Sequence, residues 1–267
     1  LADLGVAPAG LREPFARLFT QGMIRLGGTK MSKSKGNLVA PEQILDNQGA
    51  DALRLAHLQV KPPQEDVDWE DFRIDGCAKF LARVWRLAEP GSRLAAGARG
   101  GDPTEADAEV DKATHRLVAR ITDEYDRWSY NTAIAGFMEF TNLLYRWVQA
   151  DDGPHGPTLD AALDALLLVM APAAPHLCAE LWEARNGGHV HEQRWPEADP
   201  AKLVDDTVTM VVQVNGKVRD RIEVPADIDE AAAEALALAS DRVAAHLDGV
   251  SPKRVIVRPP GLVNVVV

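Results

Sequence analysis

The chain has 267 residues, 46% of them apolar, and a formal net charge of −11 at pH 7. This length allows two or three domains, and the apolar content suffices for a packed core. The two cysteines, Cys77 and Cys178, lie in helical contexts without the spacing of a disulfide framework or a zinc site. Charges and prolines interrupt the apolar run at residues 163–182, so we expect a cytoplasmic globular protein without a signal peptide or membrane span.

The most informative segment is residues 30–37, which read KMSKSKGN. A short flexible spacer separates Lys30 from Lys33, so two ammonium groups can approach one polyphosphate from different sides. Ser32 and Ser34 add hydroxyl donors. This pattern predicts a phosphate-binding loop, and the alternative is a lysine-rich surface loop without a ligand.

The surroundings of this segment favour the same interpretation. Gly36 has no Cβ to stop the backbone from folding back, and Pro41 is placed as the first residue of a helix at residues 41–46, whose N-terminal dipole would favour phosphate. Between residues 12 and 37, six basic residues stand against Glu13. The basic residues are Arg12, Arg17, Arg25, Lys30, Lys33 and Lys35. The local charge is therefore positive although the whole chain is acidic.

Apolar residues at helical spacing predict a bundle after this loop. The expected helices are residues 50–60, 69–88, 104–128, 131–149, 159–170 and 174–185, with Pro62-Pro63 after the first and a loop at residues 90–103 after the second. In residues 69–88, we expect a buried face of Cys77, Phe80, Leu81, Val84 and Leu87. Aromatic residues at helical spacing are expected in the core or its grooves rather than as base-stacking platforms, namely Trp85, Trp128, Tyr130, Trp147 and Trp182.

The period changes from helical to alternating after Trp195-Pro196. Residues 208–214 predict a strand, and Asn215-Gly216 favours a type I′ hairpin turn. In the returning strand, alternation places Lys217, Arg219 and Arg221 on one face. Val218, Ile222 and Val224 would then face the core. A helical region at residues 229–246 and strands near 253–258 and 262–267 complete a small α+β module.

The row of cations has two interpretations. Alternate residues of a strand lie about 6.8 Å apart, close to the spacing of successive phosphates along a nucleic-acid strand. The alternative is a solvated edge that prevents sheet aggregation. Elsewhere, His189 and His191 have HxH spacing but no further ligand nearby, so we expect a loop pair rather than a metal site.

The KMSKSKGN segment resembles the second signature of class I aminoacyl-tRNA synthetases, in which the loop clamps ATP pyrophosphate. Four further stretches, in order, resemble the C-terminal part of bacterial leucyl-tRNA synthetases. They are FLARVWRL (residues 80–87), YNTAIAGFMEF (130–140), APHLCAELW (174–182, followed by RWP at 194–196) and VVQVNGKVR (211–219). The closing segments at residues 247–250 and 253–257 fit the same pattern.

The resemblance implies a mainly α fold in three parts. Residues 1–62 would end a class I, Rossmann-type catalytic domain and carry the loop. Residues 63–198 would form a helical bundle of the anticodon-binding type, which holds the tRNA stem by shape and phosphate contacts. Residues 199–267 would form a small C-terminal α+β domain that binds tRNA.

The resemblance also implies adenylation of leucine and its transfer to leucine tRNA. The leucine carboxylate would attack the α-phosphorus of ATP, with Lys33 the first and Lys30 the second choice to stabilise the departing pyrophosphate. Met31, Ser32 and Ser34 would complete the ATP contacts. Mg²⁺ would arrive with ATP, without a protein-bound metal. The tRNA-binding residues would be Lys217, Arg219 and Arg221.

The chain lacks the His-x-Gly-His string with which the family holds ATP, and it has no room for the inserted editing domain. We therefore expect a fragment or the smaller subunit of a split enzyme, inactive until combined with the N-terminal catalytic portion. Two alternatives stay open. One is another class I synthetase, for isoleucine or valine, although the VVQVNGKVR hairpin counts against it. The other is a noncatalytic tRNA-binding module that retains KMSKS as a relic.

Overall fold

The computed structural model describes residues 1–8, 10–11, 15, 17–204, 207–247 and 250–267. Helices account for 51% of the chain and the sheets are small. Two compact units are present, Leu1–Asp199 and Pro200–Val267. Part of the expected closing segment at residues 247–250 lies outside the described residues. The division of the first unit into a catalytic part and a bundle stays a prediction.

The first unit begins with a small sheet in the order β2-β1-β3. Strand β1 (Ile24–Leu26) pairs antiparallel with β2 (Thr29–Lys30) and parallel with β3 (Val67–Asp68). A 3₁₀ turn, η1 (Lys33–Lys35), and helix α1 (Glu42–Asn47) follow β2. The expectation that Pro41 is the first helical residue is wrong, because Pro41 is the N-cap of α1.

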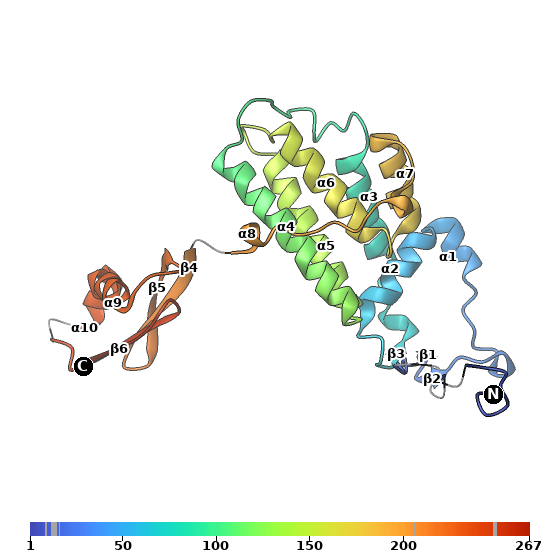
Figure 1. The fold of residues 1–267 in the computed structure, drawn as a ribbon, viewed down its shortest axis with the longest axis horizontal. Coiled ribbons are helices and arrows are strands. Elements are labelled where there is room, and N and C mark those ends of the chain that lie inside the picture. Colours follow the sequence, from blue (N-terminus) through green and yellow to red (C-terminus); the bar gives the residue numbers. More distant parts are fainter. Residues whose placement is uncertain (9, 12–14, 16, 205–206, 248–249) are drawn as a thin grey trace. The chain divides into compact units, whose positions relative to one another are not determined.

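A bundle of amphipathic helices forms the larger part of this unit (Figure 1). The helices are α2 (Ala50–Val60), α3 (Ile74–Ala88), α4 (Glu105–Asp126), α5 (Tyr130–Val148), α6 (Gly156–Met170) and α7 (Pro175–Asn186). Short 3₁₀ turns, η2 (Trp69–Asp71) and η3 (Val190–Glu192), precede α3 and follow α7. The helix expected at residues 69–88 therefore begins later than predicted. Its expected first residues instead form η2, directly after β3, and pack through aromatic contacts of Trp69 and Phe72 with His57.

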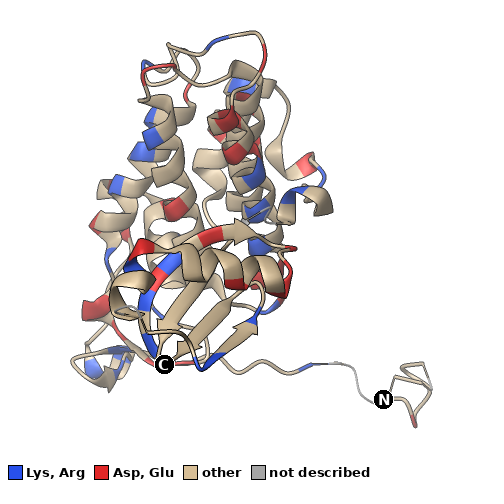
Figure 2. Ribbon diagram, turned by 90° about the vertical axis from the view of Figure 1, so that its left-hand side faces the viewer, with Lys and Arg blue, Asp and Glu red and all other residues tan. Residues whose placement is uncertain are grey.

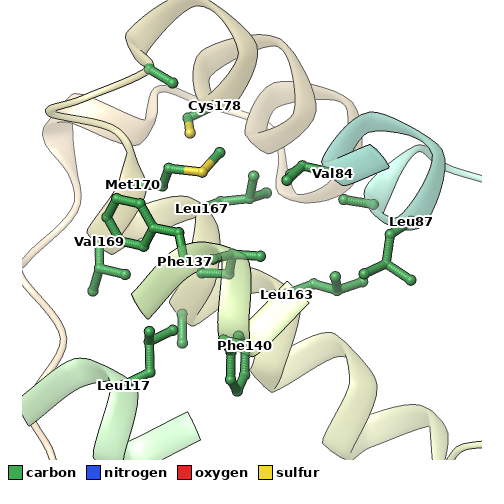
Figure 3. Packing of buried hydrophobic residues seen from close by; sticks show 14 of the residues in the cluster. Val84, Leu87, Leu117, Phe137, Phe140, Leu163, Leu167, Val169, Met170 and Cys178 are labelled. Atoms are coloured by element: carbon green, nitrogen blue, oxygen red, sulfur yellow. The ribbon is translucent and has the colours of Figure 1, made fainter. Parts of the chain in front are cut away.

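One continuous apolar core holds the bundle together (Figure 3). Phe137 of α5 lies at its centre, close to side chains of α6 such as Leu163, Leu167 and Met170. The predicted buried face of α3 is confirmed, because Cys77, Phe80, Leu81, Val84 and Leu87 all belong to this core. Burial of such side chains is the main stabilising contribution, at roughly 25 cal/mol per Å² of apolar surface.

The aromatic and thiol side chains divide between core and surface. Trp147 and Trp182 are buried as expected, whereas Trp85 and Trp128 are each 39% exposed. Trp128 closes the turn between α4 and α5 with a positive φ of 60°. Both cysteines are free and buried. Burial raises the pKa of the Cys77 thiol to about 11, so this group is protonated at neutral pH.

A buried carboxylate fixes the start of α4. Asp107 accepts hydrogen bonds from the backbone and hydroxyl of Thr104, from Trp147 Nε1 and from His155 N, and it pairs with Arg99. Burial alone would raise its pKa, but the donors of Thr104, His155 and Arg99 outweigh burial and hold the pKa well below its usual range. Asp107 therefore joins the α4 capping box to α5 and to the loop before α6.

Replacement of this carboxylate should destabilise the bundle strongly. Asp107→Ala leaves the Arg99 charge and several buried donors without an acceptor, so we expect a loss of about 3 kcal/mol in the free energy of unfolding. Because the folded pKa is depressed, the stabilisation is present above the unfolded pKa of about 3.9 and is lost as the pH falls.

Urea unfolding followed by tryptophan fluorescence tests this expectation in the first unit, because all six tryptophans lie there. Glu109→Ala on the same helix is the control, since Glu109 is exposed and its pair with Lys112 is long, at 3.6 Å. The control should stay within about 0.5 kcal/mol of the parent. Similar losses in both variants would show that Asp107 has no special role.

In its described residues, the second unit has a four-stranded sheet and three helices. Helix α8 (Pro200–Leu203) precedes the hairpin of β4 (Thr207–Val214) and β5 (Lys217–Pro225). The hairpin is followed by two helices, α9 (Glu230–Ala239) and α10 (Asp241–Leu247), and two strands, β6 (Arg254–Arg258) and β7 (Leu262–Val266). The strand order is β5-β4-β7-β6. Buried residues of α9 and α10 share a core with one face of the sheet. The predicted type I′ turn is confirmed by positive φ at both Asn215 and Gly216. Among the described residues, no helix is both long and apolar enough to cross a membrane.

Candidate functional site

The KMSKSKGN segment forms a closed turn that is built by its own polar groups. Ser32 is the N-cap of η1, and its hydroxyl accepts from Lys35 N at 3.3 Å and lies 3.1 Å from the Ser34 hydroxyl. Asn37 closes the loop, because its Oδ1 accepts from Ser32 N at 2.9 Å and its Nδ2 donates to Lys30 O at 3.3 Å. The serines and Asn37 therefore shape the backbone that presents the lysines.

Gly36 completes the turn in a way that few other residues could. Its φ of 64° places it in the left-handed region, where it caps η1 and donates to Lys33 O at 3.2 Å. A side chain at this position would be strained. The glycine and asparagine that follow the three lysines are thus a requirement of the loop geometry.

The three lysines of this turn project into solvent. Lys30, Lys33 and Lys35 are exposed, and in the described part of the chain none of them has a carboxylate at ion-pair distance. Arg25 differs, because it pairs with Asp68 at 3.3 Å and with Asp66 at 3.8 Å. Of the described basic residues between positions 12 and 37, three therefore lie in the loop, and Arg17 is exposed outside it. Arg12 and Glu13 lie outside the described residues.

Elsewhere in the first unit, positively and negatively charged side chains are interspersed. Figure 2 shows Lys and Arg interleaved with Asp and Glu along the helices of the bundle. Among the described residues, no cluster of three or more His, Cys, Asp or Glu side chains could hold a metal ion. The loop can therefore offer lysine ammonium groups, serine hydroxyls and backbone N–H groups to an anionic ligand, which is the chemistry needed to hold a polyphosphate.

The C-terminal hairpin departs from the expected alternation. Asp220 pairs with Val212, but the next pairs are Val218 with Gln213 and Lys217 with Val214, which leaves Arg219 as an extra residue. This irregularity is a β-bulge, and beyond a bulge each side chain moves to the opposite face. The expected row of three cations is therefore wrong in one member.

Burial confirms the change of face. Lys217 pairs with Val214, which is buried in the core, whereas Val218, expected in the core, is 47% exposed. Asp220 points to the helix side, where it accepts from Ser240 Oγ at 2.6 Å and pairs with Arg242 at 3.1 Å. The Ser240 hydroxyl, the Arg221 N–H and Arg242 lower the pKa of Asp220.

The sheet registers assign Arg221, Arg254 and Arg258 to the face opposite α9 and α10, and the bulged Arg219 is adjacent to Arg221 along β5. Arg219 and Arg221 flank Asp220 on β5, and Arg254 and Arg258 alternate with core-facing valines on β6. The two strands are the edges of the sheet. None of the four arginines has an ion-pair partner within the described residues, and Arg219 Nε is buried without a hydrogen-bond partner.

Partly buried residues of the inner strands lie between these arginines on the same face, namely Val211, Gln213, Leu262 and Asn264. Sequence reasoning missed Arg254 and Arg258, because only the sheet order brings β6 to the edge opposite β5. The alternation of arginines with apolar residues within residues 253–258 was the available signal, but it does not reveal which strands are neighbours.

Comparison with known proteins gives one consistent result. A family model described as tRNA synthetases class I (I, L, M and V) matches residues 4–70, and one described as the anticodon-binding domain of tRNA ligase matches residues 107–235. The leucine–tRNA ligase of Symbiobacterium thermophilum is 40% identical over 100% of this chain. The chain is homologous to the C-terminal third of leucine–tRNA ligases. These ligases are class I synthetases.

Other relatives support the same family assignment. The leucine–tRNA ligase of Nitratidesulfovibrio vulgaris is 42% identical over 96% of this chain. A ternary LeuRS–tRNA–LeuAMS complex from Agrobacterium radiobacter K84 superposes with a TM-score of 0.76 at 28% identity, over 95% of this chain and 34% of that chain. The chain spans 35% and 32% of the two leucine–tRNA ligases. The fold prediction is confirmed as the end of a class I catalytic domain followed by an anticodon-binding helical domain.

Proposed function

We propose that this chain supplies the KMSKS loop and the tRNA-binding parts of a leucine–tRNA ligase. The reaction is ATP-dependent adenylation of leucine, followed by transfer of the leucyl group to leucine tRNA. The observation that carries the proposal is a set of three exposed lysines, Lys30, Lys33 and Lys35, on a turn with a preformed backbone. Within the described residues none of them has an ion-pair partner, and the whole of this chain matches a leucine–tRNA ligase.

The adenylation step needs stabilisation of negative charge on the departing pyrophosphate. Lys33 starts η1 directly after the N-cap Ser32, so its backbone is fixed while its side chain is free. Lys30 ends β2 directly before the turn, where its carbonyl accepts from Asn37 Nδ2. Met31, Ser32 and Ser34 complete the ATP contacts, and Mg²⁺ arrives bound to ATP. The leucine carboxylate is already ionised at neutral pH and needs no general base.

The first unit also presents apolar side chains that suit coverage by another polypeptide. Leu4, Phe15 and Leu18 are 78%, 80% and 88% exposed. Large apolar side chains gathered in one segment at such exposure are typical of an interface. We therefore propose that the N-terminal catalytic portion of the enzyme, in the same or a separate polypeptide, packs on this segment and supplies the remaining ATP and leucine contacts.

For tRNA, the best-supported surface is the arginine face of the C-terminal sheet, defined as Arg219, Arg221, Arg254 and Arg258. Four guanidinium groups on two edge strands, without ion-pair partners in the described part of the chain, suit the phosphates of a nucleic-acid backbone. The face between them is only partly buried and can lie against the sugar-phosphate surface. Of the residues first expected to bind tRNA, Arg219 and Arg221 stay in the proposal, whereas Lys217 does not belong to this face.

A salt titration of tRNA binding to the chain tests the proposal. Replacing all four arginines of this face with Ala should weaken binding of leucine tRNA and reduce the salt dependence by roughly three counterions, since each phosphate contact releases about 0.7–0.9 of a counterion. Lys217→Ala is the matched control, because its side chain starts from the opposite face.

The control should bind with the parental affinity and salt slope. If Lys217→Ala lowers the slope as much per residue as the arginine replacements, the face assignment is wrong. If neither variant changes the slope, the hairpin and its sheet have a structural role and tRNA is held elsewhere.

A noncatalytic tRNA-binding module that keeps the KMSKS loop as a relic is the second candidate. The short match to the class I model, over residues 4–70, favours it. The unpaired lysines count against it. A tRNA-binding assay alone does not separate the two, whereas the activity measurements in the Discussion do.

A further inference from the structure

The bundle contains a cavity that the loop and the arginine face do not use. It has a volume of about 460 Å³, which falls in the range of small-ligand sites. Its walls come from the end of α6, the loop to α7, the start of α7, and η3 with the segment after it. Twelve residues line it: Leu168, Ala171, Pro172, Pro175, His176, Ala179, Val190, His191, Gln193, Arg194, Trp195 and Pro196.

This lining combines flat apolar surface with basic groups. Pro172, Pro175 and Pro196 provide rigid apolar walls, and Trp195 adds an aromatic ring. None of the lining residues is acidic, although the chain contains 40 Asp and Glu residues. Arg194 is exposed and has no ion-pair partner within the described residues. A flat ring that carries an anionic group fits such a lining.

Two of the lining side chains are held in place from outside the cavity. Trp195 Nε1 donates to Thr122 Oγ1 at 2.8 Å, which fixes the indole ring. His176 Nδ1 lies 2.8 Å from Asp51 Oδ1, and Asp51 is buried and also accepts from Leu177 N at 2.7 Å. The cavity is therefore ordered before any ligand arrives, which lowers the entropy cost of binding.

The Asp51 contact also determines what His176 can offer. With Nδ1 engaged, Nε2 is the free ring nitrogen, and the side chain is 73% exposed. A neutral ring can accept from a ribose hydroxyl through Nε2, and a protonated ring can donate to a phosphate. Both groups occur together in a nucleotide.

We propose that this cavity binds one nucleoside monophosphate unit, with the base against Trp195 and the prolines and the phosphate at Arg194 and His176. The unit is either an unpaired nucleotide of a bound RNA or a free nucleotide. The second family model spans the cavity, so the RNA source rests on the proposed function. The free-nucleotide source does not depend on it.

Isothermal titration calorimetry with AMP tests the cavity in the intact chain. Parental protein should bind AMP, and Arg194→Gln should bind it at least about tenfold more weakly, because a hydrogen bond to a charged group is lost. Adenosine should bind more weakly than AMP to the parent and equally to both proteins. Arg93→Gln is the matched control, since Arg93 is an exposed arginine of the same unit outside the cavity.

Two further variants examine the base contact. Trp195→Ala should weaken AMP binding about tenfold, since stacking on an aromatic ring is lost. Trp195→Phe keeps a ring but removes the hydrogen bond to Thr122, and it should retain most of the affinity. Circular dichroism of each variant confirms that the bundle is folded. Equal losses in the two variants would indicate a structural role for Trp195 and overturn the base contact.

Filter binding of leucine tRNA at fixed salt separates the two sources. Weaker binding of both AMP and tRNA by Arg194→Gln identifies an RNA nucleotide, and weaker binding of AMP alone identifies a free nucleotide. If AMP gives no binding at millimolar concentration, or binds equally to the parent and Arg194→Gln, the proposal is wrong. That outcome leaves the loop and the arginine face unaffected, because neither lines the cavity.

Discussion

The purified chain should give no leucine-dependent ATP–pyrophosphate exchange, and exchange should appear only when the N-terminal catalytic polypeptide is added. The chain matches the class I model over residues 4–70 alone, and its sequence has no His-x-Gly-His string. The proposed role of the KMSKS loop is to hold pyrophosphate, and the loop by itself cannot position leucine and the α-phosphorus of ATP for attack. Positioning contributes a large part of the rate enhancement of such reactions.

Exchange of radiolabelled pyrophosphate into ATP measures this directly. The N-terminal polypeptide alone is the necessary control and should also be inactive. The mixture should form a complex on size exclusion, with the apolar segment around Phe15 and Leu18 at the interface. Activity of the chain alone would overturn the proposed division of the active site. A stable complex without exchange would favour the noncatalytic alternative.

In the assembled enzyme, Lys33→Ala should lower the adenylation rate about 10² to 10³-fold, with little change in the affinity for leucine. The reason is the loss of one preorganised cation at the departing pyrophosphate, comparable in size to the loss of an oxyanion-hole donor. The loop backbone should survive the change, because Ser32, Gly36 and Asn37 hold it without the Lys33 side chain.

Lys35→Ala is the matched control, since Lys35 is exposed in the same turn. Its expected loss is milder, and that of Lys30→Ala lies between the two. Steady-state exchange at several leucine and ATP concentrations distinguishes an effect on the chemical step from one on binding. Small and equal losses for all three lysines would indicate that the loop is a relic.

Local patterns in the sequence predicted most of the secondary structure. Helical spacing of Cys77, Phe80, Val84 and Leu87 identified the buried face of α3, and Asn215-Gly216 identified the hairpin turn. Such patterns succeed because the helical and strand periods are properties of a few neighbouring residues. The KMSKSKGN loop could also be predicted from local sequence, because its closing hydrogen bonds all lie within residues 30–37.

Contacts between distant segments were not predictable in this way. Helix α3 begins at Ile74 rather than at the predicted residue 69. The segment before it is held by the pairing of Val67 and Asp68 with β1, and Asp68 accepts from Arg25, 43 positions earlier. His176, in the wall of the cavity, is likewise held by a contact with Asp51, 125 positions earlier in the chain. No local period encodes either contact.

The sequence by itself determined the loop, the helices, the hairpin turn and the resemblance to a class I synthetase. Only the tertiary structure decided which cations share a face. A single extra residue at Arg219 moves Lys217 to the side of the helices, and the sheet order brings Arg254 and Arg258 opposite Arg221. The physical reason is that a strand has a period of two, so one bulged residue reverses every side chain beyond it, and strand neighbours are chosen by packing rather than by sequence distance.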